Sequence, residues 1–277
     1  MTSDFSNITS DQPLVLVGGG RMGSALLSGW LAAGVEPAAV SVIEPFAETR
    51  QQLAEACPGV SLVEDAGAVQ GQPSVVVLAV KPQVMGDVVS GLPNWQGALF
   101  ISIAAGKTIS FFEDHLGADA SIIRVMPNTP AAVGAGMSVA VGNGNVSKDA
   151  QELATALLQA TGMVDWVDDE ALIDAVTAVS GSGPAYVFHL VEAMAAAGVR
   201  AGLTPELAEK LARQTVIGSG VLMREDTSDA ATLRQNVTSP GGTTQAALDV
   251  LMDNGVMVDL MVRAIAAARK RSEELSG

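Results

Sequence analysis

The chain has 277 residues, a length typical of about two domains, and 30 acidic against 15 basic residues give it a formal net charge of -15. A surface of that charge repels phosphate backbones and anionic lipids, so we expect neither nucleic acid nor a membrane as a partner. Cys57 is the one cysteine and only 2 histidines are present, which excludes an intrachain disulfide and a cysteine-based zinc site, and we expect no bound metal.

The N-terminal half alternates short apolar runs with helical patterns. Its first residues, "MTSDFSNITSDQP", lack the basic and apolar segments of a secretion signal, so we expect a cytoplasmic protein. Runs rich in Val, Ile and Leu predict strands at 14–17, 40–43, 74–80, 98–103 and 121–125, with added edge strands at 137–142 and 162–167. Helical patterns lie between them at 22–34, 47–57 and 147–160. This alternation predicts an α/β fold, with a Rossmann-like, doubly wound parallel sheet in residues 1–168.

From residue 169 onward the strand patterns stop and helical ones follow. They predict helices at 184–200, 204–224, 228–236, 243–254 and 256–272, so residues 169–277 form an all-α domain. The helix at 184–200 is apolar on nearly every side except at His189 and Glu192. These two residues either are core polar groups with partners or line the cleft, and we favour the core. Because a helical domain of this size has little interior, we expect this helix to be buried against a second subunit.

A glycine-rich loop follows the first predicted strand. In "LVLVGGGRMGSALLSGW", Gly18, Gly20 and Gly23 have the spacing G-x-G-x-x-G and stand between that strand and a helix. In such a loop the first glycine allows the tight turn, the second lets a pyrophosphate approach the backbone and the third lets the helix pack on the strand. We therefore predict that this loop, with Arg21, binds a dinucleotide.

Glu44 ends the second predicted strand, where an acidic side chain accepts hydrogen bonds from the adenosine ribose. Its charge would repel a 2′-phosphate, which favours NADH. Arg50 stands a few residues later, where it can reach a phosphate, so NADPH stays open. The alternative for Glu44 is a solvated turn residue before Pro45.

Three further strand ends contribute to the expected cofactor pocket. "LAVKPQ" carries Ala79 to Pro82, and Pro82 holds Lys81 extended at the carboxyl edge of the sheet, where ligands of open α/β folds bind. "SIAAGK" ends in small residues that allow a flat ring to lie against the backbone, and "RVMPNTP" places Asn128 beside the nicotinamide pocket. Each segment alone is also compatible with a simple turn.

A hydroxyl-rich turn, "NVTSPGGTTQAAL" at 236–248, precedes a predicted helix. Thr243 or Thr244 is expected as the N-cap. The unpaired N–H groups and the positive dipole end of such a helix form a site for an anion. A plain connector between helices is the alternative.

Six segments are typical of one family, in the order of that family. They read "GGGRMGSAL", "LAVKPQ", "SIAAG", "RVMPNTPAAVGAGMS", "DAVTAVSGSGPAYVFHLVEAMAAAGVRAGL" and "LRQNVTSPGGTTQAAL". On these segments the chain resembles the Δ1-pyrroline-5-carboxylate reductase family, the last enzymes of proline synthesis, over nearly its whole length. The resemblance implies NADPH or NADH as cofactor, a helical domain that intertwines with a second subunit as a homodimer with the substrate site at the interface, and further assembly into a pentamer of dimers.

The resemblance also implies roles for single residues. In the family the Ser-Pro-Gly-Gly-x-Thr turn holds the substrate carboxylate, which implies that task for Ser239, Gly241, Gly242 and Thr243. Thr244 corresponds to the threonine near the ring nitrogen, and we assign it and Lys81 as the catalytic residues. The family's cofactor contacts correspond to Gly18, Gly20, Met22, Val80, Lys81 and Ala105. Many members carry a small or amide side chain in place of Glu44, so the resemblance does not imply a preference for NADPH.

Two other functions compete with an imine reductase. A β-hydroxyacid dehydrogenase also joins a Rossmann domain to a helical one, but it needs Lys and Asn on an interdomain helix, and residues 184–200 contain neither. A non-catalytic dinucleotide sensor, whose helical half binds a protein, is the second. Loss of the reduced cofactor in the presence of substrate distinguishes an enzyme from a sensor.

Overall fold

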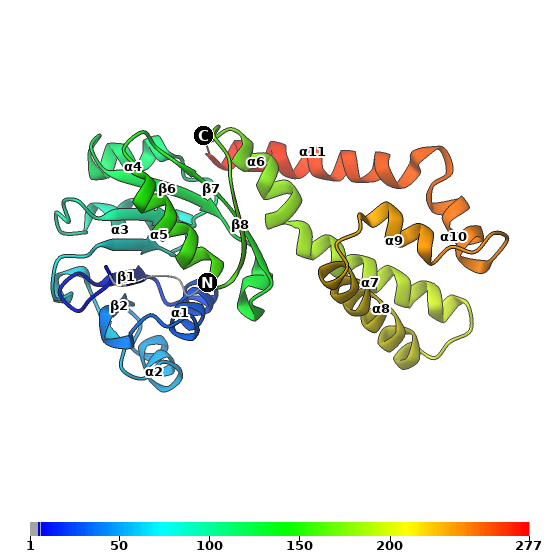
Figure 1. The fold of residues 1–277 in the computed structure, drawn as a ribbon, viewed down its shortest axis with the longest axis horizontal. Coiled ribbons are helices and arrows are strands. Elements are labelled where there is room, and N and C mark those ends of the chain that lie inside the picture. The colour runs from blue at the N-terminus through cyan, green and yellow to red at the C-terminus, as the bar shows by residue number, and fades with distance from the viewer. Residues whose placement is uncertain (1–4, 6, 277) are drawn as a thin grey trace. The chain divides into compact units, whose positions relative to one another are not determined.

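A computed structural model describes residue 5 and residues 7–276 (Figure 1). The chain divides into two compact units, one formed by Met1–Gly181 together with Arg269–Gly277 and the other by Ser182–Ala268. The predicted boundary between functional domains at residues 168 and 169 stays a prediction, because this division follows compactness and not function.

The first unit is built on an eight-stranded sheet of order β3-β2-β1-β4-β5-β6-β7-β8. Its strands are β1 (Leu14–Val17), β2 (Val40–Ile43), β3 (Ser61–Val63), β4 (Val75–Leu78), β5 (Leu99–Ser102), β6 (Ser121–Met126), β7 (Gly136–Gly142) and β8 (Gly162–Trp166). Every predicted strand is confirmed, whereas the short β3 was not predicted. Neighbouring strands are parallel except β6 and β7, which are antiparallel.

Helices cover both faces of this sheet, as the doubly wound prediction requires (Figure 1). One face packs against α1 (Arg21–Ala32), α2 (Ala47–Ala56) and α5 (Lys148–Gln159), and the other against α3 (Met85–Ser90), α4 (Ile109–Leu116) and α6 (Leu172–Val176). The central strands β1, β2, β4 and β5 are buried along their whole length, which explains why they read as continuous apolar runs. Trp30 of α1 is buried and donates its indole N–H to the Leu157 carbonyl of α5 at 2.9 Å.

The second unit is helical. Its elements are α7 (Gly183–Arg200), α8 (Pro205–Glu225), α9 (Ala230–Asn236), α10 (Thr243–Leu251) and the larger part of α11 (Val256–Ser276). The predicted helices are thus confirmed, with ends that shift by a few residues. Short helical turns complete the chain as η1 (Pro37–Ala39), η2 (Ala66–Ala68), η3 (Pro82–Val84), η4 (Thr129–Val133), a π-helical η5 (Thr177–Gly181) and η6 (Asp253–Gly255). None of the described helices is both long and apolar enough to cross a membrane.

Helix α7 presents its apolar side chains at the surface of the single chain. None of its residues is buried, and Phe188 is 63% exposed. The expectation that His189 and Glu192 lie in a core is wrong for the single chain, because their side chains are 81% and 75% exposed. The expected partner is confirmed, since the two side chains bond each other at 3.0 Å. An apolar helix left uncovered by its own chain is typical of a subunit interface.

Candidate functional site

The glycine loop between β1 and α1 has the geometry of a phosphate cradle. Gly18 has φ +102°, and a Cβ there would lie 2.9 Å from the Ala79 carbonyl oxygen, so only glycine fits. A side chain at Gly23 would overlap the carbonyl oxygen of Gly18, which ties the third glycine to the close packing of the helix. At Gly20, by contrast, a Cβ would meet no atom within 4 Å. The second glycine therefore opens the backbone to an outside group.

Helix α1 begins beside that opening with its backbone N–H groups available. Its N-cap is Gly20, no side chain caps it and no acidic residue stands in its first turn. Arg21 is exposed and Met22 is half-buried at the same end. The positive end of the helix dipole and the open backbone at Gly20 together fit the pyrophosphate of a dinucleotide.

Glu44 is buried at the end of β2, with 6% of its surface exposed. One carboxylate oxygen accepts the N–H of Gly19 at 2.9 Å and the other accepts the N–H of Phe46 at 3.0 Å. The alternative of a solvated turn residue is therefore wrong. Arg50 donates to the backbone carbonyl of Glu44 at 2.7 Å and pairs with Glu64 at 3.5 Å. A negative charge thus lies directly against the glycine loop.

The other predicted cofactor residues follow strands that are parallel neighbours, so the structure brings them to the same edge of the sheet. Lys81 is extended at φ -62° and ψ 143°, as expected before Pro82, and its side chain is exposed. Ala105 is exposed in the loop after β5. Asn128 follows β6, accepts the N–H of Met137 at 2.9 Å and donates to Ser180 at 3.3 Å. The Asn128 amide thus shapes this edge through bonds within the chain.

An ion pair that the sequence does not predict lies beside this edge. Arg124 of β6 is buried, and its guanidinium lies 2.7 Å from Glu170. The same carboxylate oxygen of Glu170 accepts the N–H of Ile109, the first residue of α4, at 2.8 Å. An arginine inside the apolar run "SIIRV" is the signal for such a partner, because a buried cation needs a counter-charge.

The hydroxyl-rich turn belongs to the second unit. The Gly242 N–H donates to the Ser239 carbonyl at 3.0 Å, and Gly241 has φ +70°, which favours glycine. The expectation that Thr243 or Thr244 is the N-cap is wrong, because Gly242 is the N-cap and the helix begins at Thr243. No side chain caps α10 and no acid stands in its first turn. The start of α10 therefore keeps its N–H groups for an anion.

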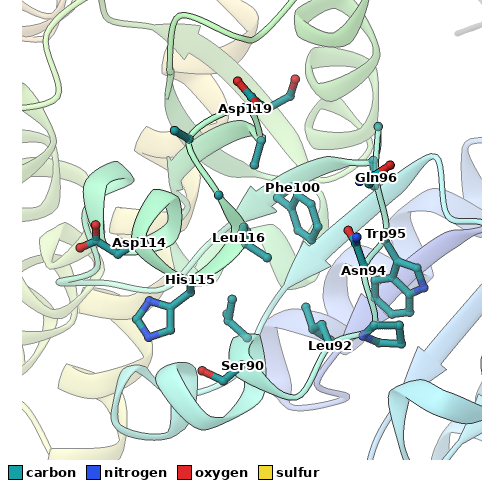
Figure 2. Close-up of a pocket in the computed structure, with 18 residues that line it drawn as sticks. Ser90, Leu92, Asn94, Trp95, Gln96, Phe100, Asp114, His115, Leu116 and Asp119 are labelled. Atoms are coloured by element: carbon teal, nitrogen blue, oxygen red, sulfur yellow. The ribbon is translucent and has the colours of Figure 1, made fainter.

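A separate hollow of about 810 Å3 lies away from the glycine loop. Figure 2 shows its walls, with Asn94 and Trp95 from the loop before β5 and His115 from α4. It lies where β5 and β6 begin, at the edge opposite to the predicted cofactor residues. Within the part of the chain that the structure describes, no group of His, Cys, Asp or Glu is arranged to hold a metal ion.

A doubly wound sheet with an open glycine loop, followed by a helical unit with uncovered apolar surface, defines an NAD(P)-dependent oxidoreductase with a dimerisation domain. Residues 13–106 match the family described as NADP oxidoreductase coenzyme F420-dependent. Residues 170–275 match the family described as pyrroline-5-carboxylate reductase dimerisation.

Individual relatives agree with this class. The chain is 42% identical over 265 residues to a pyrroline-5-carboxylate reductase of Pseudomonas aeruginosa, covering 95% of this chain and 96% of that protein. A pyrroline-5-carboxylate reductase structure from Coxiella burnetii has a TM-score of 0.89 at 37% identity and covers 96% of this chain and 99% of that one. A Plasmodium falciparum pyrroline carboxylate reductase with NADP bound has a TM-score of 0.80 at 29% identity, covering 97% and 100%. The chain belongs to the pyrroline-5-carboxylate reductase family.

Proposed function

We propose that this chain reduces the C=N bond of 1-pyrroline-5-carboxylate to L-proline with NADH or NADPH, the last step of proline biosynthesis. The observation that carries the proposal is that one chain holds two sites suited to anions. The glycine loop at Gly20 suits a pyrophosphate, and the uncapped start of α10 suits a small carboxylate. Family membership argues against a β-hydroxyacid dehydrogenase.

The cofactor is proposed to bind along the carboxyl edge of the sheet, where it supplies a hydride. The residues proposed to contact it are Gly18, Gly20, Arg21, Met22, Gly23, Glu44, Ala79, Val80, Lys81, Pro82, Ala105 and Asn128. Glu44 sets the adenosine end, because its carboxylate has about four acceptor positions and two are used by the N–H groups of Gly19 and Phe46. The remaining positions suit the two ribose hydroxyls and repel a 2′-phosphate, so we expect a preference for NADH.

The substrate is proposed to bind through its carboxylate at the turn before α10. Ser239, Gly241, Gly242 and Thr243 offer N–H groups and hydroxyls there, and these local dipoles attract an anion despite the net charge of -15. Thr244, in the first turn of α10, is proposed to hydrogen-bond the ring nitrogen. A protonated imine is already a strong electrophile, so positioning contributes most of the catalysis and no histidine acid is required.

Lys81 is proposed to meet the cofactor. Its exposed side chain stands at the carboxyl edge of β4, where a positive charge offsets the acidic surface near a phosphate or the reacting ring. Loss of this charge should weaken cofactor affinity more than it changes the substrate's KM.

The assembly is proposed to be a homodimer, arranged further as a pentamer of dimers, in the cytoplasm. The uncovered apolar side of α7 and the match of residues 170–275 to a dimerisation family support a homo-oligomer. The substrate site is proposed to be completed at the interface between two subunits.

The test is a spectrophotometric assay. Purified protein is mixed with 1-pyrroline-5-carboxylate and either NADH or NADPH, and the loss of absorbance of the reduced cofactor is followed. We expect consumption with both cofactors, faster with NADH, and slower turnover with a six-membered imine analogue. Binding of cofactor without consumption in either mixture would favour the sensor and contradict the proposal.

A further inference from the structure

The loop after β5, residues 103–108, joins the carboxyl edge of the sheet to α4. Ala104 and Gly106 are buried in it, whereas Ala105 between them is exposed. Such a loop presents one small residue on an otherwise fixed backbone. A flat ring that lies against Ala105 takes its position from this residue. The position of Ala105 in turn depends on the contacts that hold Ala104 and Gly106 in place.

The end of α11 lies directly against this loop. Gly106 has φ +69°, and a Cβ there would lie 2.8 Å from the carbonyl oxygen and 3.3 Å from the Cβ of Leu275. The Leu275 side chain itself is 57% exposed, so the contact is made by the helix backbone and not by burial of an apolar side chain. The close fit therefore fixes the distance between the backbone of the loop at Gly106 and the backbone of α11 at Leu275.

The end of α11 is itself held by a polar contact. Ser272 is the one buried residue of α11 within the described chain, and its hydroxyl donates to the Asp174 carboxylate at 2.5 Å. Asp174 lies in α6, whose neighbouring residue Ile173 is 1% exposed in the core of the first unit. Residues Arg269–Gly277 accordingly group with the first unit and not with the helical one. A buried hydroxyl in this position costs stability unless it keeps its partner.

We propose that the C-terminal end of α11 is a positioning element for the cofactor. The Ser272–Asp174 bond holds the helix end so that the Leu275 carbonyl lies against Gly106. This contact fixes the position of Ala105, the residue proposed to lie against the nicotinamide ring. This inference rests on the proposed function only in naming the ring as the group that Ala105 supports. The residues of this helix end are proposed to act through the loop, as positioning residues, and not by touching the reacting atoms.

The first test measures the loop without any reaction. Hydrogen–deuterium exchange of the protein without cofactor is compared for the wild type, Ser272→Ala, Ser272→Thr and a deletion of residues 273–277. We expect faster exchange at residues 103–108 in Ser272→Ala and in the deletion, near wild-type exchange in Ser272→Thr, and no change in the glycine loop. Ser276→Ala is the matched control, because the hydrogen bond that the described residues show for the Ser276 hydroxyl goes to the Ser272 carbonyl of its own helix. Unchanged exchange at residues 103–108 in the deletion would overturn the inference.

The second test is a double-mutant cycle on the reductase. Gly106→Ala is placed in the full chain and in the chain lacking residues 273–277. In the full chain the added methyl meets both the unfavourable φ and the Leu275 carbonyl, whereas in the shortened chain only the φ remains. We expect the deletion alone to lower kcat by about tenfold, since small misplacements are costly, and Gly106→Ala to do less harm in the shortened chain. If Gly106→Ala lowers kcat by the same factor in the full and in the shortened chain, the two changes are independent and the inference is contradicted.

The two tests separate this inference from the proposed function. ADP-ribose, which lacks the nicotinamide ring, should bind the shortened chain as tightly as the wild type. An inactive wild type whose loop exchange responds to Ser272→Ala refutes the proposed function and leaves the positioning element standing. If the wild type is active and the deletion of residues 273–277 changes neither kcat nor the exchange of the loop, the positioning element alone is refuted.

Discussion

Replacing Glu44 by Gln separates the charge of this side chain from its hydrogen bonds. In the wild type both oxygens accept backbone N–H groups, from Gly19 at 2.9 Å and from Phe46 at 3.0 Å. Gln keeps one acceptor oxygen and turns its NH2 toward the other donor. We expect a loss of about 2 kcal/mol in the free energy of unfolding, the usual worth of one hydrogen bond to a charged group.

The same substitution removes the charge that disfavours a 2′-phosphate. We expect the ratio of kcat/KM for NADPH to that for NADH to rise at least about tenfold, which corresponds to about 1.4 kcal/mol. Initial rates with each cofactor at saturating substrate measure this ratio, and urea unfolding measures the stability. Glu44→Asp is the control, because it keeps the charge and loses the reach to Gly19 and Phe46. It should weaken the loop, while its retained charge keeps NADPH disfavoured.

A ratio that stays constant in Glu44→Gln would refute this reasoning. The charge of Glu44 would then serve the glycine loop alone, and the cofactor preference would have to come from other residues.

Three further predictions concern other parts of the chain. Thr244→Ala should lower kcat by at least about tenfold with little change in NADH affinity, whereas Thr244→Ser, which keeps the hydroxyl, should retain most of the turnover; equal losses in both would remove the role of the hydroxyl. Glu170→Ala should lower the free energy of unfolding by about 3 kcal/mol in urea titrations, because it leaves the buried Arg124 without its counter-charge, and an unchanged midpoint would contradict the pairing. The pKa of the Asp229 carboxyl is lowered below 3.8 by the backbone N–H of Thr232, so the stability that it gives to α9 is complete above pH 3.8 and is lost as the pH falls through the folded pKa. Amide exchange in α9 should therefore rise in acid, and Asp229→Asn, which still caps the helix but does not titrate, should abolish that rise.

The sequence predicts most of the sheet because its buried strands are continuous runs of Val, Ile and Leu. The exceptions have physical causes. Strand β3 (Ser61–Val63) has 3 residues, none of them buried, and gives too short a pattern to detect. Strand β7 is antiparallel to β6 because the connection of residues 127–135 is too short for the crossover that parallel strands need.

The sequence likewise predicts some features of the candidate site and not others. The glycine spacing predicts the open loop at Gly20, because a position that must lack a side chain is visible in the sequence as a glycine. The hydroxyls of Thr243 and Thr244 favour these residues as the N-cap of α10, whereas Gly242 occupies that position and has no side chain to cap the helix. The Arg124–Glu170 pair joins residues 46 positions apart, and no local pattern identifies the partner.

We expect this chain to transfer a hydride directly from a reduced nicotinamide to a cyclic imine. The most direct measurement uses NADH deuterated at the transferred position of C4, with 1-pyrroline-5-carboxylate as substrate and mass spectrometry of the product. We expect L-proline that carries one deuterium, on the carbon that was double-bonded to nitrogen. Proline without deuterium, or no proline while cofactor and substrate are both bound, would contradict it.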